Sequence, residues 1–320
     1  MSRPHYNSLF KEPWAGYDVV YQPSCLLPNY NGKVWPIQYP QVTWTDSTVV
    51  IMHCQDFVSI DEFGHCPELR EIERHFGAHA HRVIVVHWNV GLENTYSGPM
   101  HLAHFPTHSY ELLNNLGANR AEWQSSLLQP RTIKWQSLNG IPRMHRRIVA
   151  AWLQARPGGV LSLGTEIPLD QWDYSTYFGC ENELNWMRLL PIYSACDVNI
   201  VTETQYSECP GIISEKTLMA ILALQVPVVI GYRGIVQHCR DLGFDMFDDV
   251  VNNSYDSSDD TPRLFQALEY NSELFANGID RTALKERLEA NQAYLLDQWP
   301  DIMIERYRQR CLEIQQILTN

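Results

Sequence analysis

Residues 211–232 constrain the fold of this chain more than any other segment, because they combine a helix start with a buried strand. Ser214 is a good N-cap residue, and the apolar residues after it predict a helix to about residue 224. The β-branched run 226–230 then predicts a short buried strand that stops at Gly231. A helix followed by a buried strand is typical of a parallel α/β sheet, with a cleft beyond the carboxyl ends of its strands.

The first turn of this predicted helix carries Glu215, Lys216 and Thr217. Free backbone N–H groups and the positive end of the helix dipole attract phosphate, and Lys216 adds a full charge at the same place. The carboxylate of Glu215 can accept hydrogen bonds from the two hydroxyls of a ribose. The turn therefore predicts a nucleotide site. The alternative is that Glu215 only complements the helix dipole and Lys216 is solvated.

The motif Ser214-Glu-Lys-Thr217, with Val226-Pro-Val-Val-Ile-Gly-Tyr232 after it, resembles the donor-site signature of the α-1,3-fucosyltransferase family. It also looks like a group of viral and bacterial glycosyltransferase-like proteins. The resemblance extends from about Asp197 to Asp256. It implies that Glu215 binds the ribose and Lys216 the diphosphate of a UDP- or GDP-linked sugar, which acts as a co-substrate without a further cofactor.

Length, charge and cysteine usage narrow the class of protein. A chain of 320 residues predicts two domains, and a formal net charge of −13 disfavours nucleic-acid binding over the whole surface. Residues 131–156 are the local exception, because they contain basic but no acidic side chains. The eight cysteines show no CxxC pairing, and the chain start lacks a signal-peptide core. With no membrane-length apolar run, we expect no membrane partner and a cytoplasmic location, in the host if the protein is viral.

Strands and helices alternate along the chain, which predicts an α/β protein with parallel sheets. The strands are expected at 48–54, 82–88, 132–138, 160–163 and 198–202, and the helices at 68–76, 110–116, 144–155, 181–193, 235–242, 262–269, 281–298 and 301–318. The first 45 residues read as irregular, and 244–247 as a short strand or turn.

Two Rossmann-like halves of this size match the GT-B architecture, in which two domains face each other across a cleft. The boundaries expected from the sequence are an N-terminal acceptor domain at 1–165 and a C-terminal donor domain at 166–300. In GT-B proteins a closing helix commonly crosses back between the domains. Residues 301–320 are the segment expected to pack back on the N-terminal domain in this way.

A second cationic helix start follows the strand near residue 135. On a helical wheel, Arg146 lies at the edge of the buried face, whereas Arg143 points nearly opposite it. Fucosyltransferase-like enzymes have an arginine at a similar position, so the resemblance implies that Arg146 binds the diphosphate from the first domain, opposite Lys216 in the second. The alternative is a solvated arginine face. The full set of donor-site candidates is Glu215, Lys216, Arg146, Arg143, Ser214, Thr217, Gly231, Tyr232 and Asn139.

An inverting transfer needs a base that accepts the proton of the acceptor hydroxyl. Asp56 directly follows the first predicted strand and is the leading candidate, with Glu93 second and His53 and His87 possible. Each of them could equally be a loop cap. Fixed positive charge near the leaving diphosphate would lower the barrier without a metal, and the chain contains no Asp-x-Asp pair for a divalent cation.

Three hypotheses follow. The first is a glycosyltransferase, expected to be inverting and metal-independent, whose acceptor is a glycan or a hydroxymethylated base of viral DNA. The second is a carbohydrate- or nucleotide-sugar-binding module without catalysis. The third is a metal hydrolase built on the histidines between residues 75 and 108, for which His101 and His104 give only a weak hint of ligand spacing.

Overall fold

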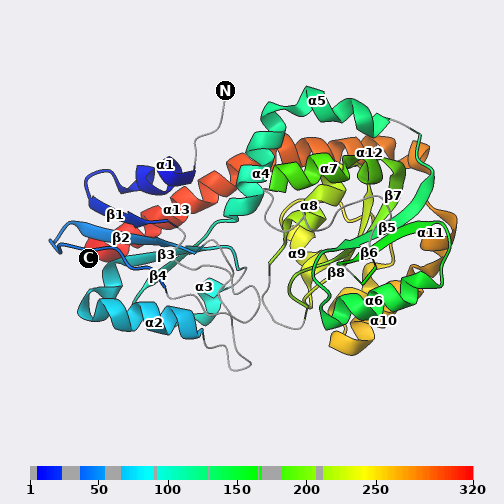
Figure 1. Cartoon of the computed structure of the whole chain (residues 1–320). Helices are drawn as coiled ribbons and strands as arrows, with labels where there is room; N and C mark the ends of the chain where they lie inside the picture. The colour runs from blue at the N-terminus through cyan, green and yellow to red at the C-terminus, as the bar shows by residue number, and fades with distance from the viewer. Residues whose placement is uncertain are drawn as a thin grey trace. The chain divides into compact units, whose positions relative to one another are not determined.

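The computed structural model describes residues 6–23, 37–54, 66–89, 92–128, 130–164, 166–167, 182–206 and 212–319. The chain divides into two compact units (Figure 1). Unit 1 comprises Met1–Glu111 and Pro300–Asn320, and unit 2 comprises Leu112–Trp299. The fold is α/β, and each unit contains a four-stranded parallel sheet. None of the described helices is long and apolar enough to cross a membrane.

The sheet of unit 1 has the strand order β1-β2-β3-β4. The elements up to this unit's boundary are α1 (Tyr6–Lys11), η1 (Glu12–Trp14), β1 (Asp18–Gln22), β2 (Thr48–His53), α2 (Pro67–Phe76), η3 (Gly77–Arg82), β3 (Val83–His87), α3 (Leu92–Thr95), β4 (His101–His104) and α4 (Thr107–Ala118), and the last helix is α13 (Trp299–Thr319).

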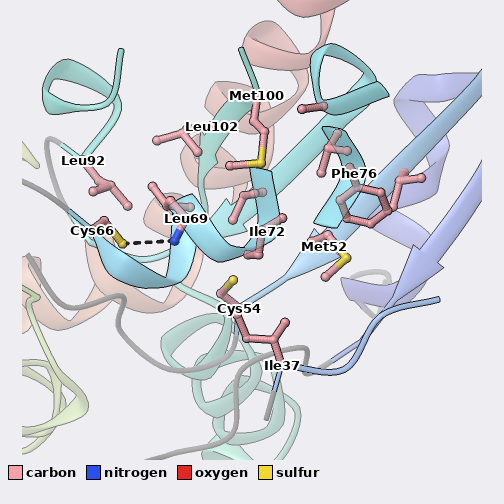
Figure 2. Packing of buried hydrophobic residues seen from close by; sticks show 14 residues of the cluster. Ile37, Met52, Cys54, Cys66, Leu69, Ile72, Phe76, Leu92, Met100 and Leu102 are labelled. Atoms are coloured by element: carbon pink, nitrogen blue, oxygen red, sulfur yellow. Dashed lines mark hydrogen bonds between the residues drawn. The ribbon is translucent and has the colours of Figure 1, made fainter. Parts of the chain in front are cut away.

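Alternate side chains of β2 pack against helices on the two faces of this sheet, because successive residues of a strand point to opposite sides. Met52 joins Leu69 of α2 in the apolar cluster that Figure 2 shows. The neighbouring His53 contacts Phe10 of α1 with ring centroids 5.0 Å apart, and Phe10 in turn contacts Tyr307 of α13 at 5.1 Å. The sheet of unit 1 is therefore covered on both faces.

The start of α2 is capped by a cysteine. Cys66 is the N-cap residue, and its Sγ accepts a hydrogen bond from the backbone N–H of Leu69 at 3.5 Å, the dashed line in Figure 2. Burial within the apolar cluster raises the pKa of the Cys66 thiol to about 12. This thiol is therefore protonated at neutral pH.

The sheet of unit 2 has the strand order β6-β5-β7-β8. Its elements are α5 (Arg120–Gln124), η4 (Ser125–Leu128), β5 (Ile133–Asn139), α6 (Met144–Gln154), β6 (Gly159–Leu163), α7 (Asn182–Ala195), β7 (Cys196–Thr202), α8 (Glu215–Leu222), β8 (Val226–Ile230), α9 (Ile235–Asp241), η6 (Asn253–Ser257), α10 (Asp260–Tyr270), α11 (Ser272–Asn277), α12 (Arg281–Ala293) and η7 (Tyr294–Gln298). Helices α6 and α10 contact each other, whereas α8 contacts α7 and α12 (Figure 1).

The division between the units falls after Glu111 and not at residue 165, where the sequence analysis sets it. The reason is that β5 pairs with β7 in parallel, with Gln136 opposite Asn199. Residues 133–163 therefore belong to the second sheet, although they precede the expected boundary. The C-terminal residues from Pro300 group with unit 1, where the hydroxyl of Tyr307 donates to the carbonyl of Phe10 at 3.3 Å.

Several local expectations also differ from the structure. The first 45 residues contain α1 and the edge strand β1, where the sequence predicts irregular chain, and β4 was not predicted. Residues 244–247 form no strand. Helix α12, the π-helix η7 and α13 follow one another without a break, so Pro300 lies inside a continuous helical run that the sequence predicts as two helices, and the π-helical turn directly precedes it.

Candidate functional site

The strand order of unit 2 reverses between β5 and β7. From β5 the chain passes through α6 to β6 on one side, and from β7 it passes through α8 to β8 on the other. Ligands of open parallel sheets bind beyond the carboxyl ends of the strands at such a reversal. Asn139 ends β5 and Thr202 ends β7, and the Thr202 hydroxyl donates a hydrogen bond to Asn139 Oδ1. The end of β5 therefore lies beside the end of β7 at this candidate site.

The first turn of α8 begins at this edge. Ser214 is the N-cap residue, as predicted, and its hydroxyl accepts the backbone N–H of Lys216 at 3.3 Å. Lys216 Nζ lies 2.9 Å from Glu215 Oε1 and 3.4 Å from the hydroxyl of Thr204. The two charged side chains are 22% and 24% exposed, so solvent reaches both. Glu215 and Lys216 thus form an ion pair with each other.

Thr217 and Ser214 are buried and face a carboxylate that the sequence analysis did not single out. Glu203 directly follows β7 and is 0% exposed. Its Oε1 accepts the hydroxyl of Thr217 at 2.6 Å and the backbone N–H of Ser214 at 3.1 Å. Thr217 therefore contacts Glu203 inside the protein. The only sequence signal for Glu203 was its place in the segment before the helix, within the stretch that carries the family resemblance.

Arg146 does not occupy the position expected of it. Both Arg146 and Lys216 belong to unit 2, because β5 and β7 are neighbours in one sheet. Arg146 is 2% exposed, and its guanidinium donates to the backbone carbonyls of Ile141, Thr202 and Glu203 at 3.1, 3.2 and 3.3 Å. The helical wheel predicts an inward orientation of this side chain, and the structure confirms it. Its contacts there are carbonyl oxygens at the ends of the strands, which is the geometry of a structural arginine.

Two other residues at the start of α6 complete this edge. Arg143 is the half-buried N-cap residue of α6, and its guanidinium makes no hydrogen bond or ion pair with the part of the chain that the structure describes. His145 is buried, and its Nε2–H donates to the carbonyl of Glu203 at 3.0 Å. Burial lowers the pKa of His145 to about 4, and the neighbouring Arg146 acts in the same direction. At neutral pH His145 is therefore uncharged.

Gly231 and Tyr232 follow β8 at the same edge. A Cβ atom at Gly231 would lie 2.6 Å from Ile235 Cδ1 and 3.2 Å from Glu203 Cβ, so glycine packs closely against both side chains. The hydroxyl of Tyr232 lies 2.5 Å from His238 Nδ1, and only 4% of this tyrosine is exposed. Asn139, at 1% exposure, is likewise buried. Among the donor-site candidates, the side chains that reach solvent are those of Glu215, Lys216 and Arg143.

The carboxyl edge of the unit 1 sheet carries the candidate bases. Asp56 lies outside the described residues. Glu93 of α3 accepts the backbone N–H of His104 at 2.7 Å, and burial raises the pKa of its carboxyl. His53 is buried, and its Nε2 lies 2.8 Å from the hydroxyl of Thr107. Burial, and then the nearby His104, lower the pKa of His87.

Several of the described histidines of unit 1 make separate contacts. His75 stacks on Tyr39 with ring centroids 3.6 Å apart, and His79 stacks on Trp44 at 4.3 Å. Nε2 of His101 lies 3.1 Å from the carbonyl oxygen of His81. No group of three or more His, Cys, Asp or Glu side chains that could hold a metal ion is found in the described ranges.

A hollow of about 850 Å³ lies elsewhere in unit 2. It is lined by Arg233, by Gln237 and Arg240 of α9, and by residues between 248 and 257, and no donor-site candidate lines it. Arg240 in this hollow pairs with Asp248, with two contacts of 2.9 and 2.5 Å. The hollow is therefore separate from the candidate site at β5 and β7, and this cation in it is already paired.

The comparisons with protein-family models, with curated proteins and with solved structures find no match to this chain.

Proposed function

We propose that unit 2 binds the nucleoside diphosphate of a nucleotide sugar at the reversal between β5 and β7, and that the chain transfers the sugar to an acceptor hydroxyl. The observation that carries this proposal is the start of α8. A lysine and a glutamate with solvent access stand there on the first turn of a capped helix, at the edge of the sheet where ligands bind.

In this proposal the ammonium of Lys216 contacts the diphosphate and the carboxylate of Glu215 turns to the ribose. Their mutual ion pair must open first, but a pair that is partly exposed is worth only about 1 kcal/mol or less. Arg143 takes the role expected of Arg146, because its guanidinium has no described partner and stands at the start of α6. Positive charge on both sides of the diphosphate would stabilise the leaving group as the glycosidic bond breaks.

The acceptor half of the reaction is assigned to unit 1, in a GT-B arrangement of the two units. Asp56, the leading candidate from the sequence, lies outside the described residues, and among the described candidates we assign the base to Glu93, because a carboxyl with a raised pKa is a better proton acceptor when deprotonated. The acceptor hydroxyl belongs to a glycan or to a hydroxymethylated base of DNA. The proposed transfer is inverting, with the proton of that hydroxyl passing to Glu93.

One observation favours the second candidate, a nucleotide-sugar-binding module without catalysis. Glu93 already accepts the backbone N–H of His104 at 2.7 Å, as a purely structural side chain would. In a module of this kind the start of α8 would bind the nucleotide sugar and release it unchanged.

Calorimetric titration with UDP and GDP tests the binding step. Lys216→Ala should weaken binding about 10- to 100-fold, because a hydrogen bond to a charged group contributes about 1.5–3 kcal/mol. The matched control is Lys285→Ala on α12, whose side chain is 66% exposed and lies 3.9 Å from Glu289. An unchanged affinity in Lys216→Ala would refute the proposed site.

Release of nucleoside diphosphate from a panel of nucleotide sugars separates the enzyme from the module. The enzyme predicts turnover with at least one donor, and Glu93→Gln should suppress it while the affinity for the donor is retained. Tight donor binding without turnover in any acceptor mixture would favour the module.

A further inference from the structure

Glu203 is a buried carboxylate that hydrogen-bonds no basic side chain in the described part of the chain. It is 0% exposed, and its two oxygens accept backbone N–H groups of Ser214 and Thr204 and the hydroxyl of Thr217. Taking a carboxylate out of water is costly unless hydrogen bonds replace its hydration. Most of the donors that replace it here belong to the start of α8. Glu203 therefore keeps these hydrogen bonds only while that turn stays in place.

The backbone of the same residue is held from two other directions. Its carbonyl accepts Nε2–H of His145 at 3.0 Å and the guanidinium of Arg146 at 3.3 Å, both from the start of α6. Its N–H donates to the carbonyl of Ile230 at 2.9 Å, at the end of β8. Gly231 packs closely beside it, since an added Cβ would lie 3.2 Å from that of Glu203. Contacts with α6 and β8, and not with α8, therefore hold the backbone of residue 203 in place.

The contacts continue from Glu203 to Lys216. Ser214, whose N–H is held by Glu203, accepts the N–H of Lys216 through its own hydroxyl. Thr204, whose N–H is also held by Glu203, accepts from Lys216 Nζ at 3.4 Å. Ser214 thus links the buried carboxylate to the backbone of Lys216, and Thr204 links it to the ammonium of Lys216.

We propose that Glu203 is the positioning residue of the diphosphate site: it fixes the first turn of α8, and with it Lys216, on the frame that Arg146 and His145 provide. This inference rests on the proposed function for the identity of the ligand. It also gives Arg146 its role, because this arginine acts on the site through residue 203 and does not contact the ligand. Small displacements of a binding group weaken its contacts strongly, so the fixed turn matters for affinity.

The test compares Glu203→Met, which removes both acceptor oxygens, with Glu203→Gln, which keeps one. Val228→Ala in β8 is the control for general loss of stability, because Val228 is 0% exposed in the same sheet and its side chain has no group that could take part in this hydrogen-bond network. Hydrogen–deuterium exchange of peptides covering residues 212–218 reports the anchoring of the turn. Titration with inorganic pyrophosphate and with UDP and GDP reports the site.

Glu203→Met should exchange about tenfold or more faster at 212–218 and bind pyrophosphate about tenfold or more weakly. Glu203→Gln should recover most of both properties, and Val228→Ala should retain wild-type affinity. If Glu203→Met does not fold, Thr217→Val removes one donor to the carboxylate at nearly constant volume and should give a smaller loss in the same direction.

Wild-type protection and affinity in Glu203→Met would overturn the inference, and so would an equal loss of affinity in Val228→Ala. If Lys216→Ala loses affinity and Glu203→Met does not, the inference fails and the proposed function stands. If the wild-type protein binds neither pyrophosphate nor a nucleoside diphosphate, the proposed function fails and the role of Glu203 in ligand binding fails with it.

Discussion

Replacing Arg146 with methionine should lower the unfolding free energy of unit 2 by about 1–3 kcal/mol. The substitution keeps the buried stem but removes the donors to the carbonyls of Ile141, Thr202 and Glu203. The Glu203 carbonyl retains His145, and the Ile141 carbonyl retains the backbone N–H of Arg143 at 2.9 Å, so the main loss is the donor to the Thr202 carbonyl, at about 1–3 kcal/mol. Relief of the desolvation of a buried guanidinium offsets part of that loss.

The neighbouring Arg147→Met is the matched control, because it makes the same change one residue along α6. The side chain of Arg147 is 48% exposed and pairs with Glu166, which is 38% exposed. A surface pair of this kind contributes about 1 kcal/mol or less, so the control should be nearly as stable as the wild type.

Hydrogen exchange of peptides from β5 and β7 under increasing urea is the suitable assay. The chain has two compact units, so a single denaturation curve of the whole protein need not be two-state, whereas peptides report unit 2 alone. Equal stability of the Arg146 and Arg147 variants would refute the structural role of Arg146. A loss of diphosphate affinity in Arg146→Met with unchanged exchange would indicate instead that Arg146 contacts the ligand.

Two further predictions concern acid sensitivity and packing. The folded pKa of His145, about 4, lies below its ordinary value of 6.5, so protons bind the unfolded state more readily. The stability that neutral His145 provides is complete above pH 6.5 and is lost as the pH falls through about 4; exchange in unit 2 should show a weaker acid dependence in His145→Gln, and an identical dependence would contradict this. In unit 1, Leu69→Ala removes a side chain that is 0% exposed and should cost about 2–5 kcal/mol, measured by exchange of α2 peptides. The control Leu312→Ala, at 49% exposure, should change little, and equal losses in the two variants would exclude a specific role for the cluster.

Local pattern predicted most of the helices and strands. The strand 226–230 has the predicted bounds, and Ser214 caps α8 as its residue type and position indicate. Strand β4 was missed because its short run His101-Leu-Ala-His104 lacks β-branched residues and reads as a loop. Strand β1 was missed because it is a partly exposed edge strand without a clear apolar alternation.

The sequence by itself determined the α/β class, the alternation of elements and the charged first turn of α8, because these depend on residue preferences within a few positions along the chain. Only the tertiary structure decided that β5 pairs with β7, that Arg146 is buried against carbonyl oxygens and that Glu203 holds the start of α8. Each of these facts joins residues that are far apart in the sequence. Strand order and the partners of a buried charge follow from packing across the whole sheet, and no local periodicity encodes them.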